Sequence, residues 1–221
     1  MRLVVEPGAG QLGIDACMAV FEGVRISNRS NPLERRKKEA LEPLRAVDAA
    51  TDPVLSGYRA LHARLGVGGV VPPAQRLLEQ VQASGRLPNI NTVVDAYNLV
   101  SALTRLSVGA HDLAQVRGDV RLGLIRGDER YWPLGAPGPE PIAAGEYAAL
   151  DAEKVLCRLD VRQCQETRIT KDTQAFAVYV QGSPATPRAL LEEGLRRIGE
   201  LVVEIGGGRY TPVAVVRGGA P

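Results

Sequence analysis

The chain has 221 residues, a formal net charge of +2 and an aromatic content of 4%. So small a net charge is not by itself the footprint of a nucleic-acid-binding protein, although a local basic patch is compatible with it, and so few aromatic residues argue against a base-stacking platform. The 3 cysteines, none in Cys-x-x-Cys spacing, and the 2 histidines form no zinc-binding pattern, and no apolar segment reaches membrane-spanning length.

The first part of the chain predicts strands. Residues 3–5 form a short one, and Glu6 and Pro7 cut this apolar run too short for a signal peptide. Residues 16–26 predict a buried strand, or a pair of strands interrupted near Gly23. Because free thiols are typical of a reducing compartment, we expect a soluble protein of the cytoplasm.

The middle of the chain predicts four helices in succession. Their starts carry N-cap residues or a first-turn proline, and they cover roughly residues 31–47, 53–65, 74–83 and 92–106. Pro43 is expected to kink or end the first helix, and His62 is expected on the surface of the second. The basic run Arg35–Lys38 fits a solvated helix face better than an RNA contact, because Glu34 and Glu39 flank it.

The rest of the chain predicts mostly strands. They are expected at residues 120–125, 155–162 and 176–180, with a short extended piece at 131–134. A helix between Pro187 and Gly206 and an edge strand at 213–216 follow. Alternation within 155–162 places Arg158, Asp160 and Arg162 on one face. Within 176–180, alternation without a bulge turns Tyr179 to the face opposite Phe176, Val178 and Val180. Strands, then helices, then strands again predict an α+β fold with mixed sheets packed against helices, in which residues 1–221 form a single domain.

The fourth predicted helix contains a carboxylate and an amide within an apolar stretch. Asn91 is a good N-cap residue, and Asp95 and Asn98 are three residues apart, so they lie on neighbouring parts of one helix face. Buried polar groups are usually structural, so the first interpretation is that this pair ties the helix to a nearby loop, with 109–113 as the candidate. The alternative is that the pair belongs to a binding site.

The run Asn91 to Val100 resembles the helix that opens the B3/B4 domain of the phenylalanyl-tRNA synthetase β subunit. It is still more similar to free-standing B3/B4 proteins, which carry Val-Asp-Ala-Tyr-Asn at this point. The resemblance covers about residues 60–185, and its further landmarks follow in order: Gly109–Leu113, Arg121, Pro133–Gly135, Gly145–Glu146, Asp151, Cys157–Arg158 and Thr170–Thr173. It implies a free-standing B3/B4-like fold.

The chain departs from the synthetase pattern at two positions. The family's His-x-Phe-Asp element is matched by Asp112, but Gly109 stands at the family's histidine and His111 at its phenylalanine. Where the family has an acidic residue that senses a tyrosine hydroxyl, alignment from Thr173 places Tyr179. The resemblance therefore implies a smaller or less polar pocket that prefers a small or aliphatic aminoacyl group.

The resemblance implies trans-editing, the hydrolysis of the ester of a mischarged aminoacyl-tRNA, without a metal or cofactor. In this interpretation His111 or Glu166 assists proton transfer. The pocket is lined by Asn98, Gly109, Asp112, Thr170, Thr173 and Tyr179. The tRNA is contacted by Arg158, Arg162 and Arg168. The expected partner is thus tRNA or aminoacyl-tRNA, with neither DNA nor a membrane.

Each of these assignments has a structural alternative. Asp112, three residues before Gln115, also fits a helix cap, and an isolated histidine such as His111 more often has no function. The three arginines fit ion pairs with Asp160, Glu166 or Asp172. For the whole protein, the alternative is a module that binds tRNA or an amino acid without chemistry.

Overall fold

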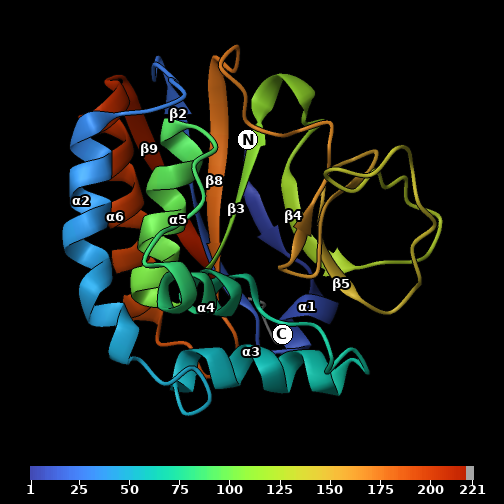
Figure 1. The fold of residues 1–221 in the computed structure, drawn as a ribbon. Coiled ribbons are helices and arrows are strands. Elements are labelled where there is room, and N and C mark those ends of the chain that lie inside the picture. Colours follow the sequence, from blue (N-terminus) through green and yellow to red (C-terminus); the bar gives the residue numbers. More distant parts are fainter. Residues whose placement is uncertain (218–221) are drawn as a thin grey trace.

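The computed structural model describes residues 1–217 and consists of two sheets and a layer of helices (Figure 1). The helices are α1 Pro7–Gln11, α2 Asn31–Leu41, α3 Pro53–Arg64, α4 Pro73–Ser84, α5 Thr92–Thr104 and α6 Arg188–Gly206, with 3-10 turns at Glu42–Ala46 and Leu113–Gln115. The strands are β1 Leu3–Val5, β2 Asp15–Glu22, β3 Ser107–Asp112, β4 Val120–Leu124, β5 Tyr147–Leu150, β6 Val155–Arg158, β7 Arg162–Gln163, β8 Ala175–Gln181 and β9 Arg209–Arg217. These elements confirm the predicted α+β class. That residues 1–221 form one domain stays a prediction, and residues 218–221 lie outside the described part.

The two sheets differ in strand order and direction. The four-stranded sheet has the order β3-β8-β2-β9 and is antiparallel throughout. The five-stranded sheet has the order β1-β4-β5-β6-β7, with β1 and β4 parallel and the remaining pairs antiparallel. Figure 1 shows the four-stranded sheet between the helices α2, α5 and α6 on one side and the five-stranded sheet on the other. Its central strands β8 and β2 are therefore largely covered on both faces, whereas the edge strand β9 has exposed residues at Arg209, Thr211 and Pro212.

Alternation along β8 divides the core into two clusters. Phe176, Val178 and Val180 pack on the helix side, whereas Ala177 and Tyr179 pack among residues of the five-stranded sheet. The pairing of β8 with β2 and β3 has no register shift, so successive side chains point to opposite faces as predicted. We call the space between the two sheets the inter-sheet layer.

The helix starts follow the expected local chemistry with one difference. Asp52 caps α3 by accepting hydrogen bonds from the amides of Val54 and Leu55. Asn91 caps α5 in the same way, through the two amides that follow Thr92. α2 is capped by Ser30 rather than by Asn31. The predicted helix 31–47 stops at Leu41, and Pro43 lies in the 3-10 turn that follows, because proline has no amide hydrogen with which to continue the helix.

Three strand predictions were wrong in extent. β2 ends at Glu22, so residues 23–26 are not a strand. Residues 109–112, expected in a loop, are part of β3. The predicted strand 155–162 breaks after β6, because Leu159 takes a left-handed conformation with φ of 52° and turns the chain. Asp160 consequently does not share an exposed face with Arg158 and Arg162 but is buried.

None of the helices within residues 1–217 combines the length and the hydropathy needed to cross a lipid bilayer.

Candidate functional site between the two sheets

The polar residues of the inter-sheet layer follow the paired strands β3 and β8. Along β3 the positions that face the layer are Ser107, Gly109 and His111, which lie opposite Gln181, Tyr179 and Ala177 of β8. We call the end with Ser107 and Gln181 the lower end of the layer, where α3 crosses below the sheets in Figure 1. The end with His111 is the upper end. The two ends differ in how well their polar groups are satisfied.

The lower end contains a buried histidine–aspartate pair. His62 has no solvent-exposed surface, and its Nε2 lies 2.6 Å from Oδ1 of Asp160, while its Nδ1 lies 3.0 Å from the carbonyl of Val70. Asp160 also accepts hydrogen bonds from the hydroxyls of Ser107, at 2.5 Å, and Tyr147, at 2.8 Å. The expectation that His62 lies on the surface was wrong, since its side of α3 packs under the sheets.

The pKa values of this pair move in opposite directions. Burial by itself lowers the pKa of His62, but the hydrogen bond and the charge of Asp160 raise it above its ordinary value. Burial raises the pKa of Asp160, and its hydrogen bonds to His62, Ser107 and Tyr147 hold it below its ordinary value. Because both ring nitrogens of His62 and both carboxylate oxygens of Asp160 have partners, the lower end is suited to holding α3 and the two sheets together rather than to chemistry.

The upper end is built around His111, which is also fully buried. Its Nδ1 lies 2.8 Å from the hydroxyl of Thr167, which lies 2.9 Å from Sγ of Cys164. The ring stacks on Tyr179 with 5.7 Å between the centroids and 17° between the planes. Nε2 of His111 has no hydrogen-bond partner within residues 1–217. Burial lowers the pKa of His111 to about 3, so the imidazole is neutral near pH 7.

An unpaired polar atom in a buried position is uncommon and needs an explanation. The amide of Gln181 at the lower end also has no partner of good geometry among the described residues, although it lies close enough to the Tyr147 hydroxyl to influence the pKa of that group. Nε2 of His111 has no such neighbour. The upper end therefore retains an unused hydrogen-bonding position in a dry environment.

Gly109 and Tyr179 occupy the middle of the layer together. A methyl group at Gly109 would lie 2.3 Å from two ring carbons of Tyr179, so the ring rests directly on the backbone of β3. Tyr179 is 2% exposed, and burial raises the pKa of its hydroxyl well above its ordinary value. The phenol is therefore neutral and fills space that a smaller side chain would leave open.

The predicted residues Asp112, Thr170 and Thr173 lie together beside the upper end. Oδ1 of Asp112 accepts a hydrogen bond from the amide of Ala114 at 3.0 Å, which confirms the capping interpretation, although the element is a 3-10 turn. Oδ2 accepts from the hydroxyl of Thr173 at 2.7 Å, and the Thr173 hydroxyl accepts from the amide of Thr170 at 3.1 Å. The amide of Asp112 donates to the carbonyl of Thr167 at 2.9 Å, which joins this cluster to the His111 neighbourhood.

The acidic candidate Glu166 and the helix residue Asn98 do not join this cluster through hydrogen bonds. Glu166 lies 3.0 Å from the guanidinium of Arg130, so its carboxylate is held in an ion pair. Asn98 is half-buried on α5. Its neighbour Asp95 accepts a hydrogen bond from the amide of Ile90 at 2.8 Å. Asp95 also lies 3.3 Å from Lys37 of α2. Asp95 is thus structural, as first interpreted, but it ties α5 to α2 and to its own preceding segment rather than to residues 109–113.

The three arginines predicted to contact tRNA interact with the protein itself. Arg158 binds Glu146 through two hydrogen bonds of 2.5 and 2.6 Å. Arg162 lies 3.8 Å from Glu140. Arg168 donates to the carbonyl of Gln165 at 3.0 Å. The partners Asp160, Glu166 and Asp172 suggested by the sequence were wrong. The turn after β6 removes Asp160 from that face, Glu166 pairs with Arg130, and Asp172 forms no ion pair with these arginines within residues 1–217.

Thr167 and Cys164 were not recognised from the sequence as neighbours of His111. Both lie in an irregular segment between β7 and β8, where neither strand nor helix periodicity reports which side chains turn inward. Within residues 1–217, no group of three or more histidine, cysteine or acidic side chains is placed to hold a metal ion.

Comparisons with known proteins address the family. The family model for the B3/4 domain matches residues 58–207. Among solved structures, the chain is similar to an N-terminal fragment of the phenylalanyl-tRNA synthetase β-subunit from Pyrococcus horikoshii, with a TM-score of 0.53 and 12% sequence identity over 95% of this chain and 50% of that one. At this identity the similarity shows the fold alone, and the chain spans half the length of that fragment. A search of the curated proteins found no match. The family model covers well over half of the sequence, so the chain belongs to the B3/4 domain family, as its resemblance over residues 60–185 predicted.

Proposed function

We propose that this protein binds the aminoacyl end of a tRNA and hydrolyses the ester of a mischarged aminoacyl group in trans. Membership of the B3/4 domain family and the fold shared with a phenylalanyl-tRNA synthetase β-subunit fragment support a tRNA-related role. The hydrolytic step rests on the chemistry of the upper end. Cytoplasmic location and the absence of a DNA partner stay predictions.

One observation carries this proposal, namely the neutral imidazole of His111 with its unpaired Nε2. In this proposal Nδ1 donates to the hydroxyl of Thr167, which in turn donates to Sγ of Cys164, so that Nε2 is the hydrogen-bond acceptor. An acceptor in a dry site holds and orients a water molecule, and the ester is already an activated substrate. Since His111 is buried, part of the structure must move aside before a ligand reaches Nε2, and the proposal assigns this movement to segment 165–174, whose Thr167 contacts the ring.

The other predicted residues take supporting roles in this proposal. The hydroxyl of Thr170 and the Asp112–Thr173 pair lie beside the upper end and offer polar contacts to the sugar or the amino group of the ligand. Glu166 takes part in proton transfer only after release from Arg130. Asn98, on α5, is proposed as a more distant lining residue.

Substrate size follows from Tyr179. Because its ring lies against Gly109 and fills the middle of the layer, the proposed pocket accepts a small or aliphatic aminoacyl group better than a tyrosyl group. A phenol in place of a carboxylate also removes the acceptor that a substrate hydroxyl needs.

A second function, binding of tRNA or an amino acid without chemistry, is favoured by a different observation. Glu166 is neutralised by Arg130, and the low pKa of His111 makes it a weak proton acceptor. A site with these properties suits recognition as well as hydrolysis.

Deacylation assays with a panel of mischarged tRNAs test the proposal. We expect the protein to accelerate ester hydrolysis over buffer for a small aminoacyl group and His111→Phe to abolish the acceleration while the melting temperature stays near that of the wild type. Tyr179→Ala is expected to extend activity to larger aminoacyl groups, and Tyr179→Glu to those with a hydroxyl. Salt-dependent binding of tRNA, without deacylation of any tRNA in the panel, would contradict the hydrolytic function and support the binding function instead.

A further inference from the structure

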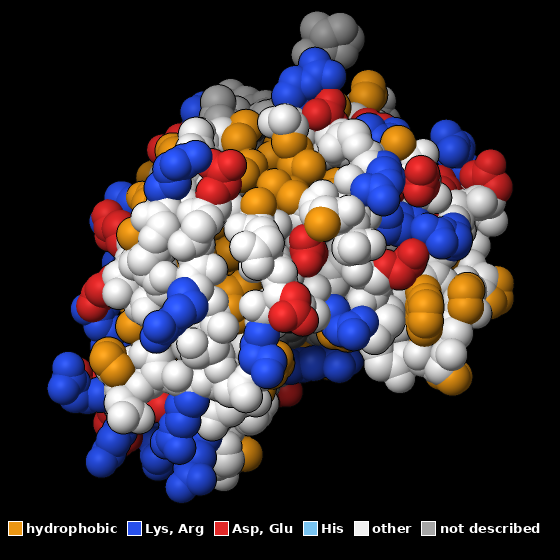
Figure 2. Space-filling model, turned by 90° about the horizontal axis from the view of Figure 1, so that it is seen from above, with side chains coloured by type: hydrophobic (Ala, Val, Ile, Leu, Met, Phe, Trp, Pro, Cys, Tyr) orange, Lys and Arg blue, Asp and Glu red, His pale blue; other side chains and the backbone are white. Residues whose placement is uncertain are grey.

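A groove of about 830 Å³ runs along α2, between this helix and the segment that connects α4 to α5. Lys38 and Arg45 line it from the α2 side, Arg86 from the connecting segment, and Arg29 from the residues before α2. We call it the α2 groove. In Figure 2, Lys and Arg side chains gather at the lower left of the picture, on the side of the molecule where α2 lies in Figure 1.

Two cations of the α2 groove are already used by the protein. Lys37, expected on a solvated face, is 4% exposed and binds Glu34 at 2.8 Å and Asp95 at 3.3 Å. Arg45 lies 3.2 Å from Glu42 in the 3-10 turn that follows α2, and its guanidinium lies against Gly85 on the opposite wall. These contacts hold the walls of the groove together and leave little charge for a ligand.

Three further cations are exposed and unused. Arg29, Lys38 and Arg86 line the groove and form no ion pair within residues 1–217, where Glu39 is the lining acid without a partner. On α6, in contrast, Arg188, Arg196 and Arg197 are all held by glutamates of the same helix. The α2 groove thus offers a local excess of positive charge that the small net charge of the chain conceals.

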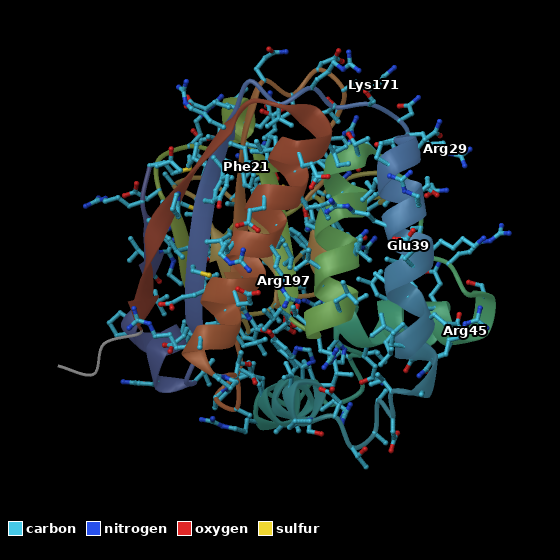
Figure 3. All side chains as sticks on the ribbon, turned by 90° about the vertical axis from the view of Figure 1, so that its left-hand side faces the viewer. Phe21, Arg29, Glu39, Arg45, Lys171 and Arg197 are labelled. Carbon is cyan, nitrogen blue, oxygen red and sulfur yellow. The ribbon has the colours of Figure 1, made fainter. Side chains whose placement is uncertain are left out.

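The groove leads towards the upper end of the inter-sheet layer. Figure 3 shows Arg29 and Lys171 at the same end of the helix layer and Arg45 at the other end of α2. Close to the groove residue Asn89, the side chain of Asn91 donates a hydrogen bond of 3.2 Å to the carbonyl of Ile169. The groove residue Asn89 is thus close in sequence to Asn91, which binds Ile169 of segment 165–174, and Thr167 of the same segment contacts His111.

We infer that the α2 groove binds the phosphate backbone of RNA, with Arg29, Lys38 and Arg86 as the contacts. Exposed guanidinium and ammonium groups bind phosphate oxygens, and the groove has no aromatic side chain on which a base would stack. Binding is therefore independent of base sequence. The choice of RNA rests on the proposed function, in which the tRNA backbone follows this groove and presents its aminoacyl end to the upper end.

The test measures binding of a fluorescently labelled, unacylated RNA hairpin with a single-stranded 3′ tail, over a series of salt concentrations. The variant Arg29→Gln, Lys38→Gln, Arg86→Gln is compared with a control of equal charge change, Arg2→Gln, Arg64→Gln, Arg126→Gln, whose residues are exposed and lie outside the groove. We expect the groove variant to weaken binding about tenfold or more and to reduce the slope of log affinity against log salt by roughly 2 to 3. The control is expected to keep both values.

Equal losses in the two variants, or no binding of the hairpin by the wild type at low salt, would overturn the assignment. The melting temperatures of both variants check that they fold. Because the hairpin carries no amino acid, this result does not depend on deacylation. Conversely, a small aminoacyl ester without an RNA chain tests hydrolysis alone, and its turnover is expected to be the same in the groove variant and the wild type.

Discussion

The two ends of the inter-sheet layer surround a buried histidine with different kinds of partner. Each contains a fully buried histidine, but His62 has a carboxylate partner, Asp160, whereas His111 has only the hydroxyl of Thr167. The pKa of His62 is consequently raised and that of His111 is lowered to about 3. The group that faces a buried imidazole therefore decides whether its pKa is raised or lowered. The end whose histidine has partners at both ring nitrogens serves stability, and the end whose histidine has an unpaired Nε2 is the better candidate for binding.

The largest expected effect comes from breaking the lower end. Asp160→Asn removes the charge that faces His62 and disturbs the acceptors of Ser107 and Tyr147, so we expect a loss of about 3–5 kcal/mol in the free energy of unfolding. Urea denaturation measures this, with Asp128→Asn, an exposed acid, as the control. A loss as small as that of the control would show that the buried pair does not hold the layer together.

A smaller effect is expected in the middle of the layer. Gly109→Ala places a methyl group 2.3 Å from Tyr179 ring carbons, and the resulting overpacking should cost about 1–3 kcal/mol. Combining it with Tyr179→Leu should recover part of the loss, because the smaller side chain vacates the same space. Gly138→Ala, where a methyl group meets no atom within 4 Å, is the control. Additive losses in the double variant would contradict the direct contact between Gly109 and Tyr179.

The smallest effect near neutral pH is the contribution of the two histidines to the pH dependence of stability. It is also the sharpest test of the comparison between the two ends. For His111 the folded pKa of about 3 lies below the unfolded value of 6.5, so the unfolded state binds the proton first and stability falls as pH drops below 6.5. For His62 the folded pKa is raised above 6.5, so its contribution is fully present below 6.5 and is lost as pH rises through the folded value.

Variants at the two positions should therefore remove contributions of opposite sign to the slope of the free energy of unfolding against pH. His111→Phe, which keeps a ring on Tyr179, should change stability by no more than about 1 kcal/mol at pH 7 and flatten the loss on the acid side. His62→Gln should remove the decline in stability as pH rises through the folded pKa of His62, and the variant should be less stable than the wild type at every pH. Denaturation midpoints measured from about pH 4 to pH 8 give both slopes. Parallel curves for the wild type and His111→Phe would show that the imidazole of His111 is not held neutral.

The sequence by itself determined the features that depend on near neighbours in the chain. Proline and N-cap signals located the starts of α3, α5 and α6, and strand alternation correctly turned Tyr179 away from Phe176 and Val178. The capping role of Asp112 also followed from spacing. These features were predictable because a cap or an alternating face is fixed by residues within a few positions of each other.

Only the tertiary structure decided the chemistry of the inter-sheet layer. His62 was expected on the surface, and its partner Asp160 lies 98 residues further along the chain, beyond a turn at Leu159 that alternation did not reveal. The partner of His111, Thr167, is 56 residues away in an irregular segment. Periodicity shows which side of an element is apolar, but the charge state of a buried polar group depends on which distant group packing brings against it.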